Sequence, residues 1–152
     1  MLHIHNNHLP EAHIIIVDDN ESDCALLQDC FQHLNWHHQV KTLRGSETLL
    51  ALLDATPHRN LLPTLIVLDC NLTPLGGETV LMLLSKDEQY KHIPVVMYSN
   101  SMTTQKEQQL HALGAAHCYR KPITVDGMLQ LAEELVHFTQ HAFNSQPQES
   151  IG

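Results

Sequence analysis

The chain has 152 residues, the usual length of one domain, and it is strongly acidic. Seventeen acidic and eight basic residues give a formal net charge of −9 with neutral histidines, and such a charge repels the phosphate backbone of nucleic acids. The longest apolar runs have four or five residues, far fewer than the roughly 20 that cross a bilayer. We therefore expect neither a nucleic-acid partner nor a membrane partner.

The beginning of the chain and the cysteines indicate the compartment. Residues 1–12 lack the basic and apolar regions of a secretion signal. The four cysteines are too few and too scattered for a disulfide framework, and none forms a C-x-x-C pair. We expect a cytoplasmic protein with reduced thiols.

Short apolar blocks alternate along the chain with segments whose apolar residues recur at helical spacing. The blocks predict strands at 13–17, 40–43, 65–68, 95–98 and 116–119. Ser46, Thr103 or Thr104, and Thr124 are predicted to cap the helices that follow, and Gly114 to end the fourth helix. The third block is apolar throughout, which favours a parallel strand covered on both faces. The sequence thus predicts an α/β fold, a doubly wound five-stranded parallel sheet with five helices.

One domain, at residues 12–142, accounts for these elements. Residues 1–11 form a histidine-rich N-terminal extension, and residues 143–152 are expected to be a disordered tail. His137 and His141 lie four positions apart on the last predicted helix and could bind Zn²⁺ or Ni²⁺. No Cys/His spacing matches a structural zinc motif, so solvated histidines are favoured.

Polar residues follow directly after four of the predicted strands. They are Asp18 and Asp19, Asp69, Ser99 and Asn100, and Lys121 with Pro122. Ligands of open parallel sheets bind outside the carboxyl ends of the strands, so these residues are expected at one edge. Three carboxylates at such close range repel one another unless a cation is present. Oxygen ligands of this kind suit Mg²⁺, or Mn²⁺.

The same residues carry a resemblance to a known family. Residues 15–20, 65–69 and 94–99, then Gly114-Ala115 and Lys121-Pro122, resemble the receiver domain of two-component response regulators. The intervals are also similar, with 50 positions from Asp19 to Asp69, 30 to Ser99 and 22 to Lys121. The resemblance covers about residues 12–142 and implies a flavodoxin-like fold with strand order 2-1-3-4-5.

The resemblance also implies a role for each site residue. Asp69 would be the phosphoacceptor, and Asp19, Asp69 and the backbone carbonyl of Asn71 would bind Mg²⁺ directly. Asp18 would act through metal-bound water. Lys121 and Ser99 would each contact a phosphoryl oxygen, and the Lys121-Pro122 bond would be cis.

Two positions depart from the family pattern. The aromatic switch residue expected three positions before Lys121 is replaced by Cys118, and Tyr119 comes one position later. Neighbouring residues of a strand point to opposite faces, so Tyr119 is not expected to replace the missing ring. The resemblance implies that Ser99 is a switch residue. Cys118 could be a second, redox-sensitive one, but a small buried thiol is favoured. The turn after Asp69 is altered too, with a shifted Pro74.

The resemblance predicts a stand-alone response regulator, similar to the small regulators that serve bacterial phytochromes. Its phosphodonor would be a sensor histidine kinase or a histidine phosphotransfer protein, and its output contact with a downstream protein target. A phosphorelay shuttle and an allosteric binder both remain open. The helix at 129–138 could serve a homodimer as well as the core.

Two other functional classes remain as alternatives. A pseudo-receiver would act by protein contact without phosphorylation. A phosphatase of the haloacid dehalogenase type would form an aspartyl-phosphate, but it requires an acid/base Asp at position 71, which is Asn. We therefore expect no enzyme activity beyond the protein's own phosphorylation and dephosphorylation.

Overall fold

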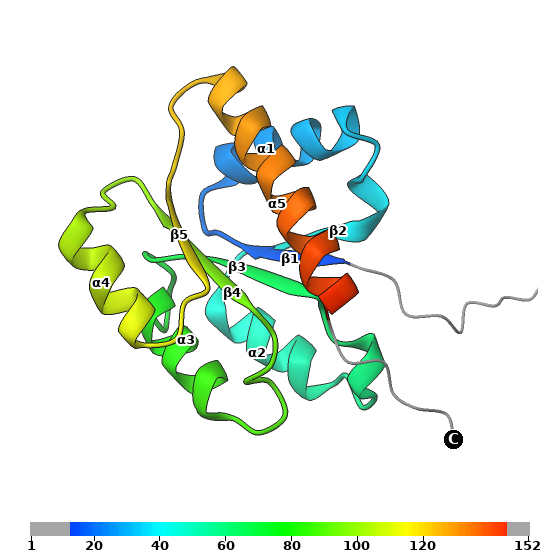
Figure 1. Ribbon diagram of the computed structural model, residues 1–152, viewed down its shortest axis with the longest axis vertical. Coiled ribbons are helices and arrows are strands. Elements are labelled where there is room, and N and C mark those ends of the chain that lie inside the picture. Colours follow the sequence, from blue (N-terminus) through cyan, green and yellow to red (C-terminus); the bar gives the residue numbers. More distant parts are fainter. Residues whose placement is uncertain (1–12, 146–152) are drawn as a thin grey trace, which may run out of the picture.

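A five-stranded parallel sheet forms the centre of the protein (Figure 1). The computed structural model describes residues 13–145. The strands are β1 (Ile14–Val17), β2 (Val40–Leu43), β3 (Leu65–Asp69), β4 (Val95–Ser99) and β5 (His117–Arg120). Their spatial order is β2-β1-β3-β4-β5, and all pairs are parallel. The predicted fold class and strand order are confirmed.

Five helices cover the two faces of the sheet. They are α1 (Glu21–His33), α2 (Ser46–Asp54), α3 (Gly77–Lys86), α4 (Thr104–Ala112) and α5 (Val125–Ser145). Helices α1 and α5 lie together on one face, and α2, α3 and α4 lie on the other (Figure 1). Side chains alternate along each strand, so Ile14 and Ile16 pack toward α1 and α5, while Ile15 and Val17 join the opposite core. The sheet is therefore buried on both faces.

The helix ends largely follow the predicted signals. Thr103 accepts a hydrogen bond from the Lys106 amide at 3.1 Å, and Thr124 accepts one from the Gly127 amide at 2.9 Å. Gly114 has φ +117° after α4, a conformation that favours glycine. These predicted signals are confirmed.

The predicted cap at Ser46 is wrong. The N-cap of α2 is Gly45, and Ser46 is the first helical residue. The Ser46 hydroxyl is buried and accepts a hydrogen bond from the Leu75 amide at 2.9 Å. Ser46 thus fixes the loop between β3 and α3 instead of capping its own helix.

Several element boundaries differ from prediction by one to three residues. Strand β5 lies one residue later than expected, because pairing with β4 aligns Ser99 with Arg120. Helix α5 continues through Ser145, three residues beyond the expected end of the domain at 142. The histidine-rich extension at 1–11 and the remainder of the tail lie outside the described residues. None of the helices described within 13–145 is long and apolar enough to cross a membrane.

Candidate functional site

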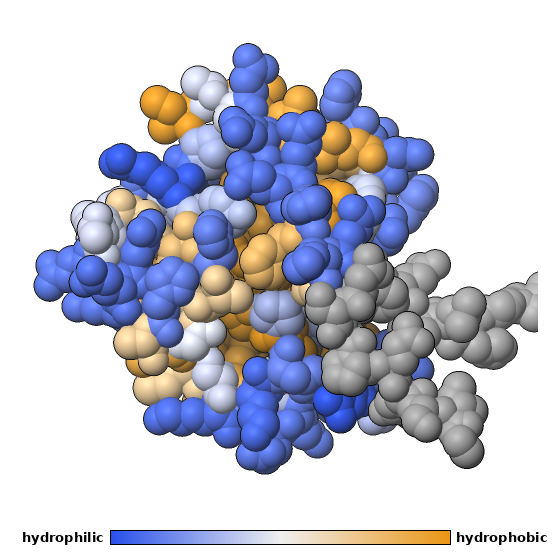
Figure 2. All heavy atoms as spheres, viewed as in Figure 1, coloured by the Kyte–Doolittle hydropathy of each residue, from blue (hydrophilic) through white to orange (hydrophobic). Residues whose placement is uncertain are grey.

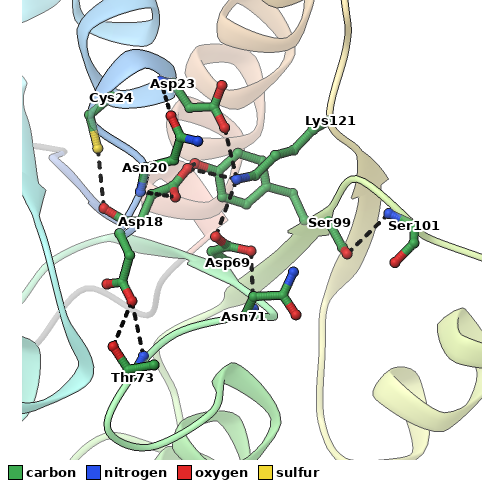
Figure 3. Close-up of polar contacts among 12 residues, drawn as sticks. Asp18, Asn20, Asp23, Cys24, Asp69, Asn71, Thr73, Ser99, Ser101 and Lys121 are labelled. Atoms are coloured by element: carbon green, nitrogen blue, oxygen red, sulfur yellow. Dashed lines mark hydrogen bonds and ion pairs between the residues drawn. The ribbon is translucent and has the colours of Figure 1, made fainter.

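The carboxyl ends of the strands bring the predicted polar residues to one edge of the sheet (Figure 3). The Lys121 ammonium lies at the centre of this edge. Its Nζ atom is 2.9 Å from Oδ2 of Asp18 and 3.2 Å from Oδ2 of Asp69. A third carboxylate, that of Asp23 on α1, is 3.0 Å away. One buried cation thus joins three acidic side chains.

Asp18 is fully buried and accepts three hydrogen bonds. The Asn20 amide donates to Oδ1 at 2.9 Å, and the Tyr98 hydroxyl and Lys121 both donate to Oδ2. Burial alone would raise the pKa of Asp18, but the hydrogen bonds from Tyr98, Asn20 and Lys121 hold it below its ordinary value. Asp18 is therefore a carboxylate at neutral pH.

Asp69 ends β3 and is almost completely buried. Its Oδ1 accepts a hydrogen bond from the Asn71 amide at 3.1 Å, and its Oδ2 accepts one from Lys121. Burial and the nearby Asp18 charge raise the pKa of Asp69 above its ordinary value, although Lys121 and the Asn71 amide oppose the rise. The two buried carboxylates thus have pKa values shifted in opposite directions.

Lys121 follows β5 and remains charged. Burial favours the neutral amine, but hydrogen bonds to Asp18 and Asp23 and the charge of Asp69 raise its pKa above the ordinary value. Its ammonium also lies 4.7 Å from the centroid of the Tyr98 ring, a distance suited to a cation–π contact.

Asp19 lies apart from this cluster. It is exposed, and its Oδ2 accepts hydrogen bonds from the Thr73 amide at 3.1 Å and the Thr73 hydroxyl at 2.8 Å. These contacts tie Asp19 to the loop between β3 and α3. Oδ1 of Asp19 accepts no hydrogen bond that we find among residues 13–145.

The donor atoms at this edge fit a hard divalent cation. Carboxylate oxygens of Asp18, Asp19 and Asp69 and the backbone carbonyl of Asn71 are the ligands that Mg²⁺ and Mn²⁺ prefer. In the described part of the chain, His, Cys, Asp and Glu side chains do not gather in threes around a preformed metal position. Asp19 faces Thr73, and the other two carboxylates face Lys121. The residues thus fit Mg²⁺ by the type of their donor atoms and not by a preformed geometry.

Ser99 is the last residue of β4 and is fully buried. Its Oγ accepts a hydrogen bond from the Ser101 amide at 3.2 Å. In this contact the Ser99 oxygen is the acceptor, so the contact does not use the hydroxyl proton of Ser99. The structure thus brings Asp18, Asp69, Ser99 and Lys121 to one edge.

Sequence reasoning missed three residues of the site: Asp23, Tyr98 and Thr73. Acidic residues are common in the first turn of a helix, so Asp23 carried no specific signal. Tyr98 ends the apolar block that predicts the fourth strand, and no sequence signal assigned it a role at the site. Thr73 lies in a loop whose path the sequence does not define. Asp23 and Thr73 belong to no motif, and the motif that contains Tyr98 does not indicate its contact with Asp18.

The predicted cis bond at Lys121-Pro122 is wrong. In the described part of the chain, the cis peptide bond is Thr73-Pro74. The direction of the Lys121 ammonium is fixed instead by the carboxylates of Asp18, Asp23 and Asp69.

Cys118 and Tyr119 point to opposite faces of β5. Cys118 is buried with Met97 in the core on the α4 side, whereas Tyr119 packs against the core on the α5 side. Tyr119 therefore does not occupy the position of the missing aromatic ring, as the alternation predicted. Burial, together with the charge of Glu107, raises the pKa of Cys118 to about 11.

We expect the thiol of Cys118 to react slowly with iodoacetamide at pH 8. At a pKa of about 11 the thiolate fraction is about 0.1%, against about a quarter for a free cysteine. Mass spectrometry of peptides after timed alkylation measures the rate, and the urea-unfolded protein is the control. Alkylation of native Cys118 as fast as in the unfolded chain would contradict this and revive its redox role.

Comparison with known proteins identifies the family of this chain. The family model of the response regulator receiver domain matches residues 14–133. The polar-differentiation response regulator DivK of Brucella anthropi is 29% identical over 117 residues, which cover 77% of this chain and 89% of DivK. The structure of the phosphorylated cyanobacterial phytochrome response regulator RcpA is 27% identical, with a TM-score of 0.75, and the match covers 86% of this chain and 94% of RcpA.

A further solved structure has the same fold. RPA3017, a response regulator in red light signalling of R. palustris, gives a TM-score of 0.78 at 21% identity, with coverage of 91% of this chain and 100% of RPA3017. The predicted resemblance to receiver domains, including the small regulators of phytochromes, is confirmed. The chain belongs to the response regulator receiver domain family.

Proposed function

We propose that this protein is a switch that accepts a phosphoryl group on Asp69. One observation carries the proposal: the Lys121 ammonium joins the buried carboxylates of Asp18 and Asp69 at the carboxyl edge of the sheet. This arrangement supplies a nucleophile, a fixed cation and an acidic neighbour in one place. RcpA, which is 27% identical, is known in a phosphorylated form.

The chemistry is an in-line transfer of a phosphoryl group. A carboxylate oxygen of Asp69 attacks the phosphorus of a phosphohistidine, the P–N bond breaks, and the imidazole leaves with its electron pair. Negative charge spreads over the equatorial oxygens during transfer. Lys121 and the Ser99 hydroxyl would stabilise those oxygens, and Mg²⁺, held by Asp19, Asp69 and Asn71 with Asp18 nearby, would neutralise further charge.

The signal would be a change of shape that a partner protein recognises. A phosphoryl group adds a charge of about −1.5 to −2 beside Ser99, drawing the hydroxyl of Ser99 and its loop toward it. The altered surface would be that of α4, β5 and α5, with the small thiol of Cys118 beneath it in place of an aromatic switch. Figure 2 shows this face with more apolar residues between α4 and α5 and hydrophilic residues over the helices.

The family sets the class of partner. Response regulators interact with kinases or phosphotransfer proteins and with downstream targets, and generally signal without enzymatic activity. For this chain, a sensor histidine kinase or histidine phosphotransfer protein is the proposed phosphodonor. A downstream protein is the proposed target, and the cytoplasm is the proposed location of this protein. Homodimerisation stays a prediction. Asn71 at the acid/base position of the phosphatase alternative argues against that class.

We expect incubation with acetyl phosphate to add one phosphoryl group only when Mg²⁺ and Asp69 are both present. Intact-mass spectrometry measures the adduct, with Asp69→Asn as the matched variant. Asp54→Asn, at the end of α2, is the control for loss of one carboxylate outside the site. An adduct on Asp69→Asn, or none on the wild-type protein with beryllofluoride also failing to bind, would reject the proposal.

A further inference from the structure

Asp23 is a site residue that neither the sequence pattern nor the family resemblance assigns. It is the third residue of α1, and its amide donates to the capping side chain of Asn20 at 2.9 Å. Its Oδ2 lies 3.0 Å from Lys121 Nζ. The Asp23 side chain is 25% exposed, against 0% for Asp18 and 7% for Asp69. Among the three carboxylates on Lys121, Asp23 therefore has by far the greatest access to water.

The donors of Lys121 are fully occupied. An ammonium has three N–H donors, and the three carboxylates of Asp18, Asp23 and Asp69 accept from them. A phosphoryl group on Asp69 brings new acceptor oxygens within reach of the same ammonium. Lys121 can donate to one of those oxygens only if it gives up one of its present partners.

Asp23 is the partner that Lys121 can release at the lowest cost. Asp18 is fully buried, and a buried carboxylate that loses its cation is strongly destabilised. Asp23 can turn to water, and it lies in the first turn of α1, where the free N–H groups of the helix favour negative charge. Its charge also repels an incoming phosphoryl group. Asp23 therefore opposes phosphorylation both by its contact with Lys121 and by electrostatic repulsion.

We propose that Asp23 is a positioning residue that holds Lys121 in the unphosphorylated protein and yields it to the phosphoryl group on Asp69. This inference deepens the proposed function and rests on it. Asp23 stabilises the resting site and lowers its affinity for the phosphoryl group. Its removal therefore has opposite effects on the two states.

The test measures beryllofluoride binding in the presence of Mg²⁺, because beryllofluoride mimics a phosphoryl group on a carboxylate. We expect Asp23→Asn to bind it about 3- to 10-fold more tightly than the wild-type protein. The ligand-free variant should unfold at a lower urea concentration, because Lys121 has lost a negatively charged partner. A purely structural role would move stability and affinity in the same direction. Asp23→Ser is also expected to bind beryllofluoride more tightly and to be less stable, and it replaces Asp23→Asn if that variant fails to fold.

Glu21→Gln is the matched control. Glu21 lies in the same turn of α1, is 79% exposed and pairs with Arg44 at 3.5 Å. We expect its beryllofluoride affinity to stay within about twofold of wild type, because exposed charges are screened. An equal gain of beryllofluoride affinity in Asp23→Asn and Glu21→Gln would show that the contact of Asp23 with Lys121 is not the cause, and would overturn the proposal.

The outcomes separate the two proposals. If the wild-type protein binds beryllofluoride and Asp23→Asn binds it no more tightly, the role of Asp23 is overturned and the proposed function stands. If the wild-type protein binds no beryllofluoride and Asp69 accepts no phosphoryl group, the proposed function fails and the role of Asp23 fails with it.

Discussion

Replacing Lys121 with methionine is expected to cost about 3–5 kcal/mol of unfolding free energy at pH 8. Methionine keeps much of the apolar stem but removes the ammonium that contacts Asp18, Asp23 and Asp69. The buried Asp18 and Asp69 then face each other without a cation. Buried charges that have lost their partner strongly destabilise the folded state. Urea unfolding followed by circular dichroism measures the difference.

This cost should decrease in acid. Burial and the charge of Asp18 already raise the pKa of Asp69 in the wild-type protein, and the loss of Lys121 raises it further. A carboxyl group with a higher pKa in the folded than in the unfolded state binds more protons when folded, so its effect on stability becomes more favourable as pH falls. We expect the difference between variant and wild type to be smaller at pH 5 than at pH 8.

The wild-type contribution of Lys121 has its own pH window. Its partners raise its pKa above the ordinary 10.5. A raised lysine pKa stabilises the folded state fully below the unfolded-state value, and this stabilisation is lost as pH rises through the folded-state value. Lys121 is therefore fully charged at both pH 5 and pH 8, and the expected pH dependence comes from the carboxylates.

Lys91→Met is the control for this experiment. Lys91 pairs with Glu88 at 2.9 Å, but the two side chains are 51% and 84% exposed. Exposed pairs of this kind contribute about 0.2–1 kcal/mol. Equal losses for the two lysine variants, or a larger cost for Lys121→Met at pH 5 than at pH 8, would contradict the assigned role of the buried cluster.

Replacing Gly77 with alanine is expected to cost about 3 kcal/mol, because the site has no space for a methyl group. A Cβ at Gly77 would lie 2.2 Å from the backbone oxygen of Asp69 and 2.9 Å from Cα of Cys70. These are backbone atoms of β3 and the residue after it, which cannot turn away as a flexible side chain would. The start of α3 or the end of β3 must shift.

The same substitution should also slow phosphorylation. The shift moves the backbone of Asp69 relative to Lys121, and transfer depends on accurate placement of the reacting groups. Urea unfolding measures the stability, and the initial rate of phosphoryl addition from acetyl phosphate measures the effect on the site. A stable variant with an unchanged rate would show that the close approach at Gly77 is not needed.

Gly76→Ala is the matched control, one residue earlier. Its Cβ would lie 4.0 Å from the backbone oxygen of Cys70, an ordinary contact, and its φ of −64° suits any residue. A weaker cap and a less flexible unfolded chain nearly cancel, so we expect a change within about 0.5 kcal/mol. Only the Gly77 variant should therefore lose stability and phosphorylation rate.

The sheet and part of the site were predictable because both depend on order along the chain. The apolar blocks identify the strands, and the parallel arrangement brings their carboxyl ends to one edge. Asp18, Asp69, Ser99 and Lys121 therefore meet wherever that fold forms. The glycine after α4 and the caps at Thr103 and Thr124 were also readable, since each acts within four residues of its own position.

The partners of these residues could be found only from the tertiary structure. Asp23 and Lys121 are 98 positions apart, and their contact depends on how α1 is rotated over the sheet. Tyr98 and Asp18 are 80 positions apart, and Asp19 and Thr73 are 54 apart. The sequence determined which residues end each strand. Packing between distant elements decided which side chain each of them contacts, because hydrogen bonds need ångström-scale distances that residue order does not specify.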